Sequence, residues 1–229
     1  MAQLHGIGET VKKSIVGTVR GTGEIVNAVT DTVSSSLSNV LRGAGAIGQA
    51  LTGAVSDVAR GVIQGTSQVG GDLGAAAKGA VIGTLRGTKE VGGEALDTVG
   101  STVQNLVEET AEVGGDIAAA AKQAMEGTLQ GAKSIGLNVL DAVGAAAGGA
   151  VKAASQAGGD VAKVARGAVE GAIAGSKDIG MSAAEAASAA ATGALKAAGD
   201  IGGAAGDQVR RAVTGTISGV KVVIKEPFK

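Results

Sequence analysis

Gly70 to Lys89 reads GGDLGAAAKGAVIGTLRGTK, and close variants of this stretch return along the chain. It reappears as GGDIAAAAKQAMEGTLQGAK from Gly114 and as GGDVAKVARGAVEGAIAGSK from Gly158, so the offset is 44 residues both times. A weaker copy, GGAAGDQVRRAVTGTISGVK, starts at Gly202. The basic step is 22 residues, or two elevens, because further glycines stand 22 residues before each of these starting points: Gly48, Gly92, Gly136 and Gly180.

An eleven-residue repeat predicts α-helix, because eleven residues make three turns at about 3.67 residues per turn. Apolar or small residues keep the same column when the sequence is written in rows of eleven, as in Ile7, Thr18, Val29, Val40, Leu51 and Val62. Charged residues share columns of their own, one of which holds Lys78, Lys89, Lys122 and Lys133. On a helix these columns form separate apolar and charged arcs. The sequence therefore predicts an all-α protein of long amphipathic helices.

One helical phase runs through most of the chain and divides it into three parts. We expect an N-terminal tail at 1–6, a continuous helical repeat region at 7–219 and an extended C-terminal tail at 220–229. Pro227 forbids further helix in that last part, where Val220 to Lys225 is a short strand or an extended arm.

Two architectures fit the repeat region. It is either one continuous or gently kinked helix, about 300 Å long at 1.5 Å per residue, or a set of long hairpins. In hairpins the chain would turn at the Gly-Gly-Asp sites, where glycine ends one helix and aspartate caps the next. Loops in ordinary helical bundles shift the phase, so the unbroken phase favours continuous or gently kinked helices.

Glycines spaced by four predict close helix packing. On a helix this spacing gives a smooth flank that another backbone can approach. Gly114 and Gly158 stand in an apolar column that holds Met125 and Val169 eleven residues later, which predicts close packing or a tight turn there. The predicted helix-packing residues are Gly79, Gly83, Gly87, Gly114, Gly127, Gly131, Gly158, Gly171 and Gly175.

The glycine content also requires a partner surface for the helices. The chain holds 41 glycines, and each costs a helix about 0.8–1 kcal/mol relative to alanine. An isolated helix does not survive a total on the order of 30–40 kcal/mol. The partner surface can be other copies of the chain, other segments of the same chain, or an apolar interface.

Composition excludes several classes of function. Twenty basic residues are interleaved with 21 acidic ones, so no basic face for nucleic acid is expected. The chain has no Cys and one His (His5), which argues against thiol chemistry and metal binding. Since no nucleophile, base or paired acids stand in a catalytic arrangement, we expect no enzyme activity, no catalytic residues and no cofactor.

The hydropathy of the sequence indicates the cellular location of the protein. The first residues, MAQLHGIGETVKKSIVG, lack the apolar segment of a signal peptide. The longest uncharged run, Gly43 to Ser56, has 14 residues, fewer than the roughly 20 that span a bilayer. We therefore expect a cytoplasmic protein, with a peripheral position on a lipid surface as the alternative.

By its elevens the chain resembles the amphipathic-helix repeat proteins: perilipins, synucleins, exchangeable apolipoproteins and group 3 late-embryogenesis-abundant proteins. The phrases GTLRGTKEVGGEALDTVG and GAVSDVARGVIQGTSQV look most like the perilipin repeat region. The resemblance implies helices that form on lipid droplets, on membranes or on drying. This chain departs from these families by its high glycine content and near absence of aromatic residues.

The first functional hypothesis is a non-enzymatic structural protein. Its Gly/Ala-rich helices would assemble side by side, copy against copy, into an oligomer, sheath or filament. The alternatives are a peripheral coat on lipid droplets, membranes or storage granules, and a desiccation or ice-binding stress protectant. The expected partner is the protein itself, with lipid or another apolar surface as the alternative.

Overall fold

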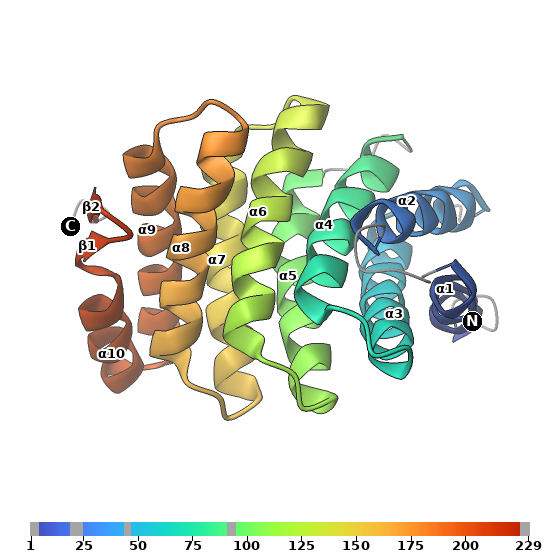
Figure 1. The fold of residues 1–229 in the computed structure, drawn as a ribbon, viewed down its shortest axis with the longest axis horizontal. Coiled ribbons are helices and arrows are strands. Elements are labelled where there is room, and N and C mark those ends of the chain that lie inside the picture. The colour runs from blue at the N-terminus through green and yellow to red at the C-terminus, as the bar shows by residue number, and fades with distance from the viewer. Residues whose placement is uncertain (1–4, 19–24, 44–46, 91–94, 225–229) are drawn as a thin grey trace.

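The structure is a computed structural model that describes residues 5–18, 25–43, 47–90 and 95–224. Ten helices and one short hairpin form in these ranges (Figure 1), so the all-α prediction is confirmed. The elements are α1 (His5–Thr18), α2 (Ile25–Gly43), α3 (Ile47–Gln68), α4 (Leu73–Glu90), α5 (Ala95–Glu112), α6 (Ile117–Ile135), α7 (Val139–Gln156), α8 (Val161–Asp178), α9 (Ala183–Ile201), α10 (Gly203–Val213), β1 (Gly215–Ile217) and β2 (Val220–Val222).

The helices stack in two layers. Helices α2, α4, α6 and α8 form the layer facing the viewer in Figure 1, α3, α5, α7 and α9 lie behind them, and α1 stands at the end of the stack against α3. The most extensive contacts join helices two apart in the sequence, and α4, α6 and α8 run side by side within the front layer. Each 44-residue repeat is therefore one pair of antiparallel helices, and the pairs stack into a helical-repeat solenoid.

Glycine turns separate the helices from α3 to α4 and from α5 to α9, and they follow each other every 22 residues between Gly114 and Gly180. In the turn after α5, Gly114 has φ +72°, and the N–H of Gly115 donates to the carbonyl of Thr110 at 2.8 Å. This is the Schellman ending of a helix, which needs a residue in the left-handed region. Four equivalent glycines in the described ranges occupy the same region: Gly70, Gly136, Gly158 and Gly180. Gly202, at the next position, has a φ of +152° and lies outside it.

A polar side chain two residues after each turn glycine caps the next helix. Asp116 accepts hydrogen bonds from the N–H groups of Ala118 and Ala119 at 2.9 and 3.2 Å. Such a cap satisfies backbone donors that have no partner within the helix. The equivalent caps are Asp72, Asn138, Asp160 and Ser182.

The expectation of continuous or gently kinked helices is wrong, and the hairpin alternative is correct. One helix together with its turn occupies 22 residues, the spacing from Gly114 to Gly136. Because 22 is two elevens, the chain can turn without changing the phase of the repeat. An unbroken phase therefore does not distinguish a continuous helix from a stack of hairpins.

The ends of the repeat region also differ from the prediction. Helix α1 already begins at His5, and α10 ends at Val213, not at 219. Strands β1 and β2 follow as an antiparallel hairpin with a two-residue turn. The turn residues Ser218 and Gly219 have φ of +48° and +81°, and a type I′ turn requires positive φ at both positions. The predicted extended tail is thus a short strand at its start; residues 1–4 and 225–229 lie outside the described residues.

The core lies between the two layers and is built mainly from alanine and valine. The larger fully buried side chains are few and spaced along the stack, among them Leu37, Leu85, Leu106, Met125 and Leu129. Small side chains let the layers approach closely. The apolar arc that the repeat predicts is therefore covered within a single chain.

Asp116 gives a test of the turn geometry. Replacement by Ala is expected to cost about 1 kcal/mol of unfolding free energy, whereas Asn should retain most of the cap. The hydrogen bond from Ala119 is the main cause that lowers the pKa of Asp116, assisted by that from Ala118 and by the charge of Lys163. Because this pKa is lowered, the ionised Asp116 stabilises the folded protein fully above the unfolded-state pKa of about 3.9. This stabilisation is lost as the pH falls through the folded-state pKa. Urea unfolding followed by circular dichroism at pH 7 and at pH 3 measures this; an equal cost at both pH values would contradict it.

Candidate functional site

Lines of glycine join neighbouring helices within a layer. A Cβ added at Gly79 would lie 2.6 Å from the carbonyl oxygen of Val26, and one added at Gly83 would lie 2.6 Å from that of Thr30. On α6, the next helix of the same layer, a Cβ at Gly127 would lie 2.6 Å from the carbonyl oxygen of Lys78 on α4. No real Cβ sits that close to a carbonyl oxygen, so only glycine permits these backbones to approach as they do.

Seven of the nine predicted packing glycines face a neighbouring helix in this way. Besides Gly79, Gly83 and Gly127, a Cβ at Gly87 would meet Ser34 of α2, and one at Gly131 would meet α4. Gly171 faces the carbonyl of Lys122, and Gly175 faces Glu126. The neighbours are segments of the same chain, which is one of the three partner surfaces that the glycine content requires.

The packing role predicted for Gly114 and Gly158 is wrong, and the tight turn predicted for the same sites is correct. A Cβ at either position would meet nothing within 4 Å. Both residues have positive φ, +72° and +66°, which side chains with a Cβ disfavour. Glycine is needed there for the backbone conformation of the turn.

Other packing glycines were missed by the sequence prediction. Gly149 of α7 faces the backbone of Gly100 on α5, and Gly193 of α9 faces that of Gly144 on α7. A sequence signal for them exists, because Gly127, Gly149, Gly171 and Gly193 follow each other at steps of 22 residues. One packing position therefore serves helices of both layers.

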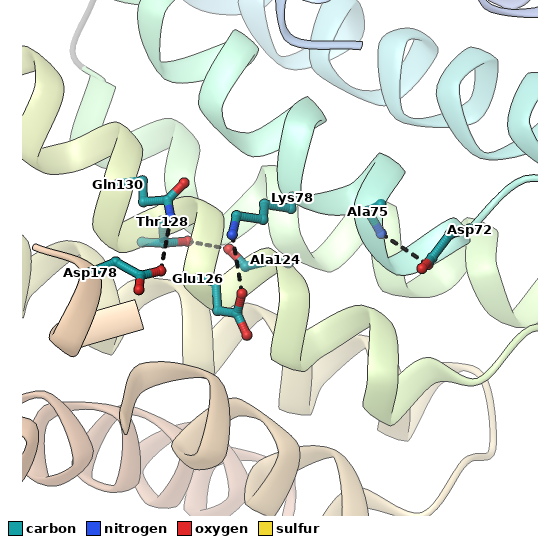
Figure 2. A network of polar contacts seen from close by, with 8 residues as sticks. All are labelled: Asp72, Ala75, Lys78, Ala124, Glu126, Thr128, Gln130 and Asp178. Carbon is teal, nitrogen blue, oxygen red and sulfur yellow. Dashed lines mark hydrogen bonds and ion pairs between the residues drawn. The ribbon is translucent and has the colours of Figure 1, made fainter. Parts of the chain in front are cut away.

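Polar side chains bridge adjacent helices of a layer and fix their register. Lys78 of α4 donates to Glu126 of α6 at 3.1 Å, and both side chains are largely buried. Figure 2 shows this pair together with the hydrogen bond from Gln130 of α6 to Asp178 of α8, at 3.2 Å. Each bond joins residues 48 apart in the sequence. The charged columns of the repeat thus pair helices within one chain.

Glu109 interrupts the glycine pattern. It occupies the position at which the neighbouring repeats have Gly87 and Gly131, and it faces α3, where its Oε1 accepts from Arg60 Nε at 3.0 Å. The residue is only 5% exposed, and its Oε2 has no hydrogen-bond partner in the structure. Burial raises the pKa of Glu109 above its usual value against the opposing effect of Arg60. The junction of α3 and α5 is therefore held by a charge pair where other helices have a glycine contact.

An open groove of about 870 Å³ crosses the outer face of α5, α7 and α9. Its floor is made of small residues, among them Gly144, Ala145 and Gly148 of α7. Charged side chains lie at its two ends. Asp141 and Glu185 stand in the first turns of α7 and α9, and the groove is also lined by Lys152, Lys196 and Asp200. We call this surface the α5–α7–α9 groove.

Within the part of the chain that the structure describes, no three His, Cys, Asp or Glu residues come together in a way that could hold a metal ion. Over the same residues, the helices are too short or too polar to cross a bilayer.

Comparison with known proteins gives little. No family model and no curated protein matches this chain. Among solved structures, it is similar to the crystal structure of a de novo designed helical repeat protein, with 17% identity, a TM-score of 0.32 and coverage of 93% of this chain and 95% of that chain. The assignment to the helical-repeat class rests on the stacked helix pairs described above. The resemblance to perilipins and other eleven-residue-repeat proteins stays a prediction.

Proposed function

We propose that this protein is a non-enzymatic structural scaffold whose copies associate side by side through the α5–α7–α9 groove. The groove floor supports the proposal, because it leaves glycine and alanine half-buried and open to the groove on the outer face of α7. The same residue types bring helices together inside the fold. A helix of another copy could therefore approach this face as closely as helices within the chain approach one another.

The remaining surface supports a limited assembly. Helix α10 and strand β2 pack on the last helices of the stack, and the outer side of α10 carries exposed polar residues, including Asp207, Arg210 and Arg211. Polar capping elements of this kind discourage end-to-end stacking of solenoids. A side-by-side oligomer is thus favoured over a filament that grows from the ends.

The groove gives a direct test of this function. A Cβ at Gly144 would come no closer than 3.7 Å to another atom, so Gly144→Gln should fill the groove without disturbing the fold. We expect the wild type to show a mass above the 21.7 kDa of one chain by light scattering, and the variant to show that of the monomer. Gly53→Gln is the matched control, because a Cβ there meets nothing within 4 Å and Gly53 lies outside the groove. A wild type that stays monomeric at high concentration would refute the proposal.

A lipid coat remains the alternative, and it would require the stack to open. The apolar arc is buried between the layers, and the exposed large apolar side chains in the described ranges are Ile201 and Val223. Circular dichroism with and without vesicles separates the two functions. Full helicity in plain buffer that lipid leaves unchanged supports the scaffold, whereas helix that appears only with vesicles supports the coat.

A further inference from the structure

The charges of the α5–α7–α9 groove are arranged by helix direction. Helices α7 and α9 run parallel, and each carries an acid in its first turn and a lysine eleven residues later: Asp141 and Lys152, Glu185 and Lys196. Eleven residues span about 16 Å of helix. One end of the groove is therefore acidic, and the other is basic apart from Asp200.

A surface with an acidic end and a basic end is complementary to a second copy of itself turned by 180°. In a twofold interface the same patch is used by both subunits, so every contact is made twice. In this orientation the lysines of the second copy lie over the acids of the first copy, and the acids of the second copy lie over the lysines of the first copy. A copy docked in the parallel direction would instead bring like charges together, which costs affinity.

The surface of α9 suits it to contact the α9 of a second copy. Between Glu185 and Lys196, its face toward the groove includes the small residues Ala189 and Thr192. Gly193 in the same stretch packs against Gly144 of α7 in the same chain. Two such helices can approach closely when they run antiparallel. The middle of this face lies between Ala189 and Thr192, so in antiparallel alignment position 185 of one copy faces position 196 of the other.

We infer that a second copy of the chain docks in the α5–α7–α9 groove about a twofold axis, with the two α9 helices antiparallel and Glu185 of each copy facing Lys196 of the other. This inference rests on the proposed function, and it names the partner and its orientation. The result is a closed dimer.

Two charge reversals test the orientation. Glu185→Lys places two lysines in contact at both symmetric positions, and Lys196→Glu places two acids in contact. Each variant alone is expected to associate about tenfold more weakly or worse. A mixture of the two should form a heterodimer. The Glu185→Lys site of one chain then faces the Lys196→Glu site of the other with opposite charge, and the unchanged Lys196 and Glu185 form the second pair. Lys177→Glu is the control. It makes the same charge change as Lys196→Glu, at an exposed residue of α8 that lies outside the groove.

The outcomes separate this inference from the proposed function. Light scattering of the mixture should give twice the 21.7 kDa of one chain, while each variant alone gives the monomer. If Gly144→Gln abolishes association but the mixture stays monomeric, the antiparallel geometry is wrong and the groove remains the interface. If both charge variants associate as the wild type does, the orientation is likewise wrong. A monomeric wild type overturns both.

Discussion

Gly171→Ala is expected to destabilise the protein by about 1–3 kcal/mol, the usual cost of overpacking a tight interface. The added methyl group would overlap the carbonyl of Lys122 on α6, and a backbone atom cannot move aside as a side chain can. The same substitution at Gly53, where a Cβ meets nothing, should stabilise by about 1 kcal/mol through helix propensity. Opposite signs at two helical glycines would identify the glycine line as an interface.

Gly127→Ala extends this test to the preceding interface. Its Cβ would lie 2.6 Å from the carbonyl oxygen of Lys78 on α4. Both interfaces include α6, so the double variant measures whether the two contacts are coupled; effects that add to within about 0.5 kcal/mol would show that they are independent. Because the chain has no Trp or Tyr, urea unfolding is best followed by far-ultraviolet circular dichroism. A stabilising effect at Gly127 or Gly171 would show that the backbones do not meet there.

Arg60→Ala is expected to cost about 1–3 kcal/mol at pH 8. Removing one partner of a fully buried ion pair costs 3–5 kcal/mol, and the value is reduced here because the Arg60 side chain is 53% exposed. The variant leaves the Glu109 carboxylate buried without its counterion. Arg60→Ala combined with Glu109→Gln should recover much of the loss, and a double-mutant cycle would measure the coupling.

The pH dependence of this pair has a definite sign. Burial raises the pKa of Glu109 in the folded protein, so the folded state holds the proton more tightly than the unfolded state. The ionised group therefore costs stability above its folded-state pKa, and that cost declines as the pH falls through it. Glu109→Gln should be more stable than the wild type at pH 8, with the difference shrinking toward pH 4. A difference that grows as the pH falls would contradict the assignment.

Secondary structure could be predicted from the sequence, because the eleven-residue columns fix which side of each helix is apolar. Architecture could not, since a helix and its turn fill 22 residues and leave no phase shift. The information that decides it is local: Gly114 adopts positive φ, and Asp116 caps the following helix. Either feature alone also suits a packing site or a charged face, which is why the Gly-Gly-Asp phrase allowed two interpretations.

The groove was also beyond prediction from the sequence. Gly144 and Gly148 stand at repeat positions where the earlier units have charged residues, Lys78 and Lys122 in one column and Arg60 and Glu126 in the other. Only the position of α7 on the outer face shows that these small residues line a groove. The sequence does contain a signal for Glu109. Positions 65, 87 and 131 hold glycine at steps of 22 residues, and Glu109 replaces the glycine expected between 87 and 131.

Small-angle X-ray scattering of dilute protein in plain buffer tests the folded solenoid most directly. A stack of 22-residue hairpins should give a radius of gyration of about 17–20 Å for the monomer, as for a compact domain of 229 residues. A chain that forms one continuous helix about 300 Å long would give a value near 90 Å, and an unfolded chain one near 50 Å. A radius in the range of either alternative would contradict the account of turns at every second eleven.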